Sequence, residues 1–261
     1  MTMLETKETS YIRSGKALVD NVSIRFDDGK FTAIVGPNGA GKSTLVRLLC
    51  GELSPTSGTV FLNGNDIRSI APWRQACLRA VMPQASQLAF PFKVFEVAQL
   101  GVSGIGRNLG HAVRADIISR ALERADIHHL KGRMYPTLSG GEKQRVHFAR
   151  VLAQLEAGRS VEPKQILFLD EPIASLDLKH QLLLLTEARK LTEHGLTIIA
   201  VLHDLQLAAD LCDRILMMAN GACVGMGTPE EILTPDRITE TFEISLNTAQ
   251  LPPSPWKALS A

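Results

Sequence analysis

The residues with the clearest chemical meaning form a glycine-rich loop near the start of the chain, here called the phosphate loop. It consists of Gly36, Pro37, Asn38, Gly39, Ala40, Gly41, Lys42, Ser43 and Thr44 and matches the pattern G-x-x-x-x-G-K-[ST]. Glycines let the backbone take positive φ, so that successive N–H groups can surround a phosphate. Lys42 supplies a positive charge to the β and γ oxygens, and the Ser43 hydroxyl is a ligand for Mg²⁺. We predict that this loop binds a nucleoside triphosphate.

A pair of carboxylates, Asp170 and Glu171, follows an apolar run at residues 166–169. Buried carboxylates are costly unless they are paired or bound to a metal. We expect Asp170 to hold Mg²⁺ through water and Glu171 to polarise the attacking water. The alternative is a helix-capping Asp followed by a solvated Glu, and the phosphate loop in the same chain argues against it.

A second glycine-rich turn, Ser139-Gly140-Gly141, begins a helix with apolar residues at Val146 and Leu152. We call it the serine–glycine turn. A hydroxyl and bare glycine amides at a helix N-terminus form an anion site. Taken alone, the same residues are an ordinary helix cap. The phosphate loop elsewhere in the chain favours the anion site.

Four further side chains are candidates, each with a simpler alternative. Gln84 can reach the metal or the water, or it is a surface glutamine. His203 ends a predicted strand and can bond a γ-phosphate, or it is a core histidine. Tyr11 can stack on adenine or simply pack, and Asp177 can contact a second subunit or cap a helix.

The elements that must position these residues form an α/β pattern. Apolar runs typical of buried strands alternate with helical patterns and lie at residues 31–35, 166–169, 196–202 and 215–218. Such alternation indicates a parallel sheet covered on both faces. Three of these strands end on polar residues, where ligands of open α/β sheets bind.

Residues from about 91 to 155 carry helical patterns and few strand-like runs, so we predict a helical subdomain inserted into the sheet domain. Its last helix is expected over 142–155, and residues 156–165 are expected to form a surface loop. Prolines from about residue 228 to 261 predict a C-terminal extension of short helices and a tail. All of this fits a single domain over 1–261.

The bulk composition excludes several classes. The 261 residues carry a net charge of +1, which argues against a dedicated nucleic-acid binder. The four cysteines are scattered and form no C-x-x-C pair, which is typical of reduced, buried thiols. No apolar run approaches the ~18 residues that span a bilayer, so any membrane-spanning part must belong to other chains.

Taken in order, these motifs resemble the nucleotide-binding subunits of ABC transporters. The matching segments run from about Tyr11 to Phe242 and include Gln84 and residues 138–142, 166–171 and 175–177. The resemblance implies a P-loop NTPase core with a parallel sheet, an N-terminal antiparallel β part and a helical subdomain. It also implies ATP and Mg²⁺, with ATP sandwiched between the phosphate loop of one copy and the serine–glycine turn of a second.

A finer resemblance concerns the cargo. Residues 86–92, 133–137 and 176–181 are similar to the ATPases of bacterial hemin importers, within the group that also imports iron–siderophores and vitamin B12. This implies an enzyme that hydrolyses ATP to energise hemin uptake. Its expected partners are a permease dimer and, indirectly, a periplasmic binding protein, with this chain peripheral on the cytoplasmic face of the inner membrane.

Two other functions remain as alternatives. An ATP-driven clamp on DNA or ribosomes would use the same fold, but the chain has neither the long heptad pattern nor the second phosphate loop usual in such proteins. The other alternative is a subunit of an exporter, and only the resemblance to importer ATPases argues against it. Residues 90–92, just after Gln84, are a candidate docking site for the permease, or they pack within the helical part.

Overall fold

The computed structural model describes residues 2–84, 88, 90–105 and 109–244. The chain forms two compact units. Unit 1 contains residues 1–70 and 197–261, and unit 2 contains residues 71–196. Among the described residues, no helix combines the length and the apolar character needed to cross a membrane.

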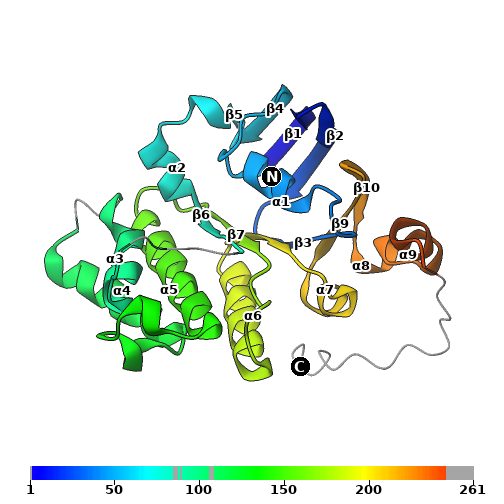
Figure 1. Ribbon diagram of the computed structural model, residues 1–261. Coiled ribbons are helices and arrows are strands. Elements are labelled where there is room, and N and C mark those ends of the chain that lie inside the picture. Colours follow the sequence, from blue (N-terminus) through cyan, green and yellow to red (C-terminus); the bar gives the residue numbers. More distant parts are fainter. Residues whose placement is uncertain (1, 85–87, 89, 106–108, 245–261) are drawn as a thin grey trace. The chain divides into compact units, whose positions relative to one another are not determined.

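Unit 1 begins with an antiparallel sheet in the order β2-β1-β4-β5 (Figure 1). Its strands are β1 (Thr2–Arg13), β2 (Lys16–Asp27), β4 (Ser57–Leu62) and β5 (Asn65–Asp66). Ser14 and Gly15 both have positive φ and make the two-residue turn that reverses β1 into β2. Val22, Ile24 and Phe26 alternate inward along β2 and bury one face of the sheet.

The parallel part of unit 1 places β3 between β8 and β9. The strands are β3 (Phe31–Val35), β8 (Thr197–Val201), β9 (Arg214–Ala219) and β10 (Ala222–Gly227). Every residue of β3 and β8 is buried, as expected for strands covered on both faces. The predicted strands at 31–35, 196–202 and 215–218 are confirmed, whereas β10, antiparallel to β9, was not expected.

The helices of unit 1 are short. They are α1 (Lys42–Leu49), α7 (Leu205–Leu211), α8 (Pro229–Ile232) and α9 (Pro235–Phe242), with a 3-10 turn at Ile67–Ser69. The helices expected in the C-terminal extension therefore exist as α8 and α9. The predicted tail at 245–261 lies outside the described residues.

Unit 2 contains a pair of parallel strands, β6 (Arg79–Met82) and β7 (Ile166–Asp170). Its helices are α2 (Pro72–Leu78), α3 (Val94–Ser103), α4 (His111–Arg124), α5 (Gly140–Gly158) and α6 (Leu178–Glu193), with 3-10 turns at His128–Leu130 and Tyr135–Thr137. Helix α5 packs against α3 and α4 (Figure 1). Gly101 makes this packing close, because a Cβ there would lie 2.2 Å from the Arg150 carbonyl oxygen.

Helix α5 ends at Gly158 rather than at residue 155. The surface loop expected over 156–165 is correspondingly shorter at its start. Ala157 and Gly158 are buried, so tertiary packing extends the helix past the point at which the polar sequence suggested an end.

Candidate nucleotide site

The phosphate loop follows directly from the buried strand β3, and its glycines are required by conformation and, at Gly36 and Gly41, also by space. Gly36, Gly39 and Gly41 have φ of 146°, 79° and 94°. A Cβ on Gly36 would lie 2.1 Å from the Met218 carbonyl oxygen, and one on Gly41 would lie 2.2 Å from the Leu18 carbonyl oxygen. Only glycine fits at these two positions.

Lys42 begins α1 and is only 6% exposed. Its Nζ donates to the carbonyl oxygens of Gly36, at 2.8 Å, and Pro37, at 2.9 Å. These bonds hold the ammonium over the loop. The N-cap of α1 is Gly41, which has no side chain to bond the amides of the first turn, and that turn contains no acidic residue. A buried cation beside an uncapped helix N-terminus suits the binding of a phosphate.

Two more predicted site residues lie in unit 1. His203 follows β8 and is exposed, so the interpretation as a core histidine is wrong. The next residue, Asp204, caps α7 by accepting hydrogen bonds from the amides of Gln206 and Leu207, at 2.9 and 3.0 Å. Tyr11 is half-buried in β1, opposite Val19 of β2, with register shifts on either side of it. Its stacking on adenine remains a prediction.

Asp170 ends β7 in unit 2, and Glu171 follows with a left-handed φ of 50°. Gln84 Nε2 donates to Glu171 Oε2 over 2.6 Å. Although residues 84 and 171 are far apart in sequence, the structure brings them together. Gln84 is exposed, as the interpretation as a surface glutamine predicts, and its side chain also bonds the Glu171 carboxylate. An amide and a carboxylate in contact can both bond one water molecule.

The serine–glycine turn has the geometry of a capping box at the start of α5. The Glu142 amide donates to Ser139 Oγ over 3.3 Å, and the Ser139 amide donates to Glu142 Oε2 over 2.7 Å. The bond from the Ser139 amide lowers the pKa of the Glu142 carboxyl below its ordinary value. The helix-cap interpretation is confirmed as local geometry, and the anion site remains a prediction.

Asp177 likewise caps a helix. Its Oδ1 accepts from the His180 amide, 3.0 Å away, at the start of α6. This backbone hydrogen bond lowers the pKa of the exposed Asp177 carboxyl. The Asp177 side chain stays exposed, and its contact with a second subunit remains a prediction.

Gln144 was missed by the sequence analysis. It lies on α5, is 9% exposed, and contacts the segment after β7. Its Nε2 donates to the Glu171 carbonyl oxygen over 3.2 Å, and its Oε1 accepts from the Ser175 amide over 3.3 Å. The sequence did contain a signal for it, because Gln144 lies four residues before Phe148 and so shares the apolar face of the predicted helix.

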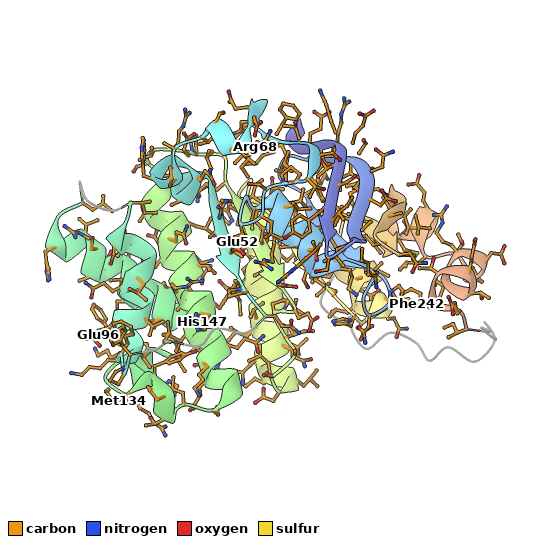
Figure 2. All side chains as sticks on the ribbon, turned by 45° about the horizontal axis from the view of Figure 1, so that its top comes forward. Glu52, Arg68, Glu96, Met134, His147 and Phe242 are labelled. Atoms are coloured by element: carbon orange, nitrogen blue, oxygen red, sulfur yellow. The ribbon has the colours of Figure 1, made fainter. Side chains whose placement is uncertain are left out.

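A buried polar cluster lies farther along α5, around His147, which Figure 2 labels. Tyr135 Oη lies 2.8 Å from His147 Nε2. Burial, with a smaller contribution from Arg150, lowers the pKa of His147 to about 4, and burial raises the pKa of Tyr135. Arg150 donates to the Val81 carbonyl oxygen over 2.8 Å and so ties α5 to β6.

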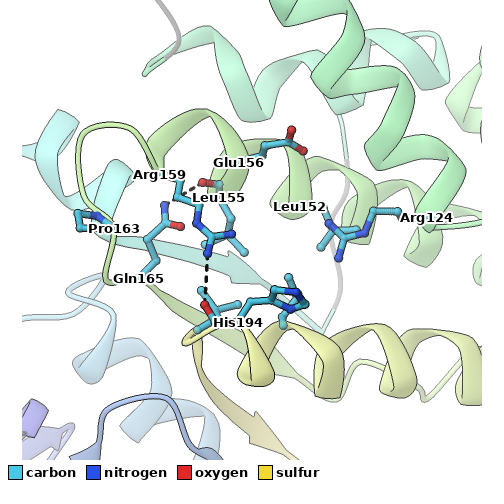
Figure 3. Close-up of a pocket in the computed structure, with 10 residues that line it drawn as sticks. Arg124, Leu152, Leu155, Glu156, Arg159, Pro163, Gln165 and His194 are labelled. Carbon is cyan, nitrogen blue, oxygen red and sulfur yellow. Dashed lines mark hydrogen bonds between the residues drawn. The ribbon is translucent and has the colours of Figure 1, made fainter.

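Two cavities of unit 2 differ in character. One, of about 190 Å³, is lined by residues that include Gln84, Gly140, Gln144, His147 and Ser175. The other, of about 290 Å³, lies beside the loop after α5 and has leucines and Arg159 in its wall (Figure 3). The guanidinium of Arg159 donates to the His194 carbonyl oxygen there. None of the predicted site residues lines this second cavity.

A comparison with known families decides the assignment. The family model described as ABC transporter matches residues 19–174, more than half of the chain. The chain belongs to the ABC transporter family. The predicted membership of this family and the predicted ATPase activity coupled to transport are thereby confirmed. The matched region includes β3, the phosphate loop, Gln84, the serine–glycine turn and Glu171.

Individual relatives agree with the family. The chain is 43% identical over 243 residues to the hemin import ATP-binding protein HmuV of Rhodopseudomonas palustris strain BisA53, covering 93% of this chain and 88% of the relative. It is 45% identical over 232 residues to HmuV of Gloeobacter violaceus, covering 88% of this chain and 83% of the relative.

The fold agrees with solved ABC cassettes. A dimeric post-hydrolysis ATP-binding cassette with ADP and Pi bound has a TM-score of 0.78 and 24% identity, covering 87% of this chain and 99% of that one. The predicted P-loop NTPase fold, with its N-terminal antiparallel part, is confirmed. Cassettes of this fold form dimers and bind nucleotide in such structures.

Proposed function

We propose that this chain is the ATP-hydrolysing subunit of a bacterial ABC importer and that it energises hemin uptake. The observation that carries the ATPase part is the phosphate loop, where glycines are sterically required and the Lys42 ammonium is buried over the loop. The hemin part is supported by the names of relatives that are more than 40% identical over most of the chain.

In this proposal the phosphate loop holds ATP. Backbone N–H groups of the phosphate loop, to which Pro37 contributes none, bond the β-phosphate. Lys42 bonds the β and γ oxygens, and Tyr11 stacks on the adenine. The hydroxyl of Ser43, the amide of Gln84 and the carboxylate of Asp170 are hard oxygen donors suited to Mg²⁺. A Mg²⁺ ion, when bound, neutralises charge on the phosphate oxygens.

The Glu171 carboxylate is proposed to accept a hydrogen bond from the attacking water and then to take its proton. The water oxygen forms the new bond to the γ-phosphorus as the bond to the β–γ bridging oxygen breaks, and the products are ADP and phosphate. Gln84, which already bonds Glu171 Oε2, orients the water, and His203 bonds a γ-phosphate oxygen.

A second copy of the chain is proposed to complete each site. The partner would supply its serine–glycine turn to the γ-phosphate side of the nucleotide and would place Asp177 at the interface. Shifting a closed–open equilibrium from 1:99 to 99:1 needs about 5.5 kcal/mol of differential binding. Charge-assisted hydrogen bonds of about 1.5–3 kcal/mol each to two γ-phosphates can supply it.

The chain is proposed to act on the cytoplasmic face of the inner membrane, as a peripheral subunit bound to a permease dimer. A periplasmic binding protein would deliver the cargo indirectly, and no nucleic acid is involved. Phe90 is 68% exposed, with its ring edge-on to Phe92 at 6.2 Å between centroids. Phe92 is half-buried, and the exposed ring of Phe90 beside it supports permease docking there. Within residues 86–92, the segment that resembles hemin importer ATPases, residues 86, 87 and 89 lie outside the described residues.

Reconstitution tests this proposal. The chain would be assembled with its permease in vesicles, with ATP on the side of this subunit and the binding protein with hemin on the other. We expect ATP-dependent hemin accumulation that the Lys42→Ala variant abolishes. Hemin uptake that continues with the variant, or accumulation of vitamin B12 in place of hemin, would contradict the proposal.

A further inference from the structure

Gln144 makes two hydrogen bonds to the backbone of a single segment. Its Nε2 donates to the Glu171 carbonyl oxygen, and its Oε1 accepts from the Ser175 amide. A carbonyl can only accept and an amide N–H can only donate, so one orientation of the Gln144 amide satisfies both bonds. Both the nitrogen and the oxygen of the Gln144 amide are therefore fixed, and the amide bridges the backbone of residues 171 and 175.

The spanned segment is compact and conformationally constrained. The Ala174 amide donates to the Glu171 carbonyl oxygen over 3.4 Å, and the Leu176 amide donates to the Ile173 carbonyl oxygen over 3.1 Å. Glu171 itself has a φ of 50°, a conformation that a residue with a side chain keeps only when its surroundings impose it. The bond from Gln144 to the Glu171 carbonyl is one such restraint.

The start of α5 also contacts this segment directly. A Cβ added to Gly141 would lie 3.0 Å from the Ser175 carbonyl oxygen and 3.5 Å from Leu176 Cδ2. The absent side chain therefore lets the serine–glycine turn approach the segment of its own chain. Gln144 lies on the same helix one turn further on, and the two contacts join α5 to residues 171–176.

We infer that Gln144 is a positioning residue that clamps the segment 171–175 to α5 and thereby sets the orientation of the Glu171 carboxylate. The inference rests on the proposed function, which makes Glu171 the group that activates water. Gln84 restrains the carboxylate end of Glu171 and Gln144 restrains its backbone end.

Two substitutions separate the parts of the clamp. Gln144→Glu keeps size and the acceptor for the Ser175 amide but replaces the donor with an oxygen that faces the Glu171 carbonyl. Gln144→Leu removes both bonds at similar volume. The matched control is Gln154→Leu on the same helix, because Gln154 donates two bonds to the carbonyl oxygens of Ala76 and Arg79, each over 2.9 Å.

The measurements are steady-state ATP turnover and amide hydrogen exchange on the full-length chain. We expect Gln144→Glu to lower kcat about tenfold with the KM for ATP changed less than about twofold. We expect Gln144→Leu to speed exchange of the Ser175 amide about tenfold. The control should lower thermal stability without either effect.

The outcomes are distinguishable. Unchanged exchange at Ser175 in Gln144→Leu, or an equal fall of kcat in the control, would overturn the clamp. If the Glu171→Gln variant turns over ATP as fast as the wild type, the proposed role of Glu171 is overturned. The catalytic half of the inference then fails with it. If the wild type hydrolyses no ATP, the proposed function fails, whereas the exchange measurement still decides whether Gln144 holds the segment.

Discussion

His147 gives a pH dependence that can be calculated before it is measured. The side chain is 5% exposed and is bonded to the Tyr135 hydroxyl, and its pKa is lowered to about 4, mainly by burial. In the unfolded chain the pKa returns to about 6.5. Between these values the unfolded chain binds more protons than the folded protein. Stability is therefore present above pH 6.5 and is lost as the pH falls toward 4.

The magnitude follows from the two pKa values. The difference between a pKa of 6.5 in the unfolded chain and about 4 in the folded protein corresponds to about 3 kcal/mol of unfolding free energy. The protein loses this amount once the pH has fallen below both pKa values. The loss is close to linear between the two pKa values, at about 1.4 kcal/mol per pH unit, because the unfolded chain binds about one proton more throughout this range. Between about pH 7.5 and about pH 5, we expect His147 to remove about 2 kcal/mol.

The assay is urea unfolding of the full-length protein at both pH values, for the wild type and for His147→Gln. Gln keeps an acceptor for the Tyr135 hydroxyl but does not titrate in this range. Carboxylates that titrate do so in both proteins, so their contribution cancels in the difference. If both proteins lose the same unfolding free energy, burial of a neutral His147 is not the cause and the reasoning is refuted.

Three further predictions concern the nucleotide site. Lys42→Ala removes the buried ammonium and should abolish ATP binding in an equilibrium titration; normal affinity would contradict its assigned role. Gly36→Ala places a Cβ 2.1 Å from the Met218 carbonyl oxygen, so it should destabilise the protein by more than about 3 kcal/mol in urea unfolding. Gly39→Ala meets no atom within 4 Å and should cost less, and equal losses would argue against the steric explanation. Glu171→Gln should bind ATP normally but slow its hydrolysis by about 10²–10⁴-fold, leaving an ATP-stabilised dimer on gel filtration, and unaltered turnover would exclude it as the base.

The parallel strands and the phosphate loop could be predicted because their signals are local. Strand β3 is a continuous apolar run, and the loop that follows it must supply glycines where a Cβ would strike neighbouring backbone. The antiparallel sheet of unit 1 was expected only through resemblance. In β1 the buried positions include Thr6 and Thr9 rather than apolar residues alone, and Thr6 is satisfied by a hydrogen bond to the Val22 carbonyl oxygen, 2.8 Å away. Its burial depends on a partner strand, which periodicity does not reveal.

The same limit applies to the candidate site. The contact between Gln84 and Glu171 agrees with the sequence-based hypothesis, which placed Glu171 at the attacking water and Gln84 at the water or the metal. Gln144 was not, since its partners lie on a segment far along the chain and a glutamine in a helix ordinarily indicates a solvated face. Close packing of the fold, rather than the local pattern, gives this residue its role.

The most direct test of the central claim mixes two inactive variants. Lys42→Ala retains the serine–glycine turn, and Ser139→Arg retains the phosphate loop, so only a mixed dimer contains one intact composite site. At equal amounts we expect ATP turnover to return to about a quarter of the wild-type rate, because half of the dimers are mixed and each has one intact site. A mixture that stays as inactive as its components, or full turnover by Ser139→Arg alone, would contradict a site shared between two copies.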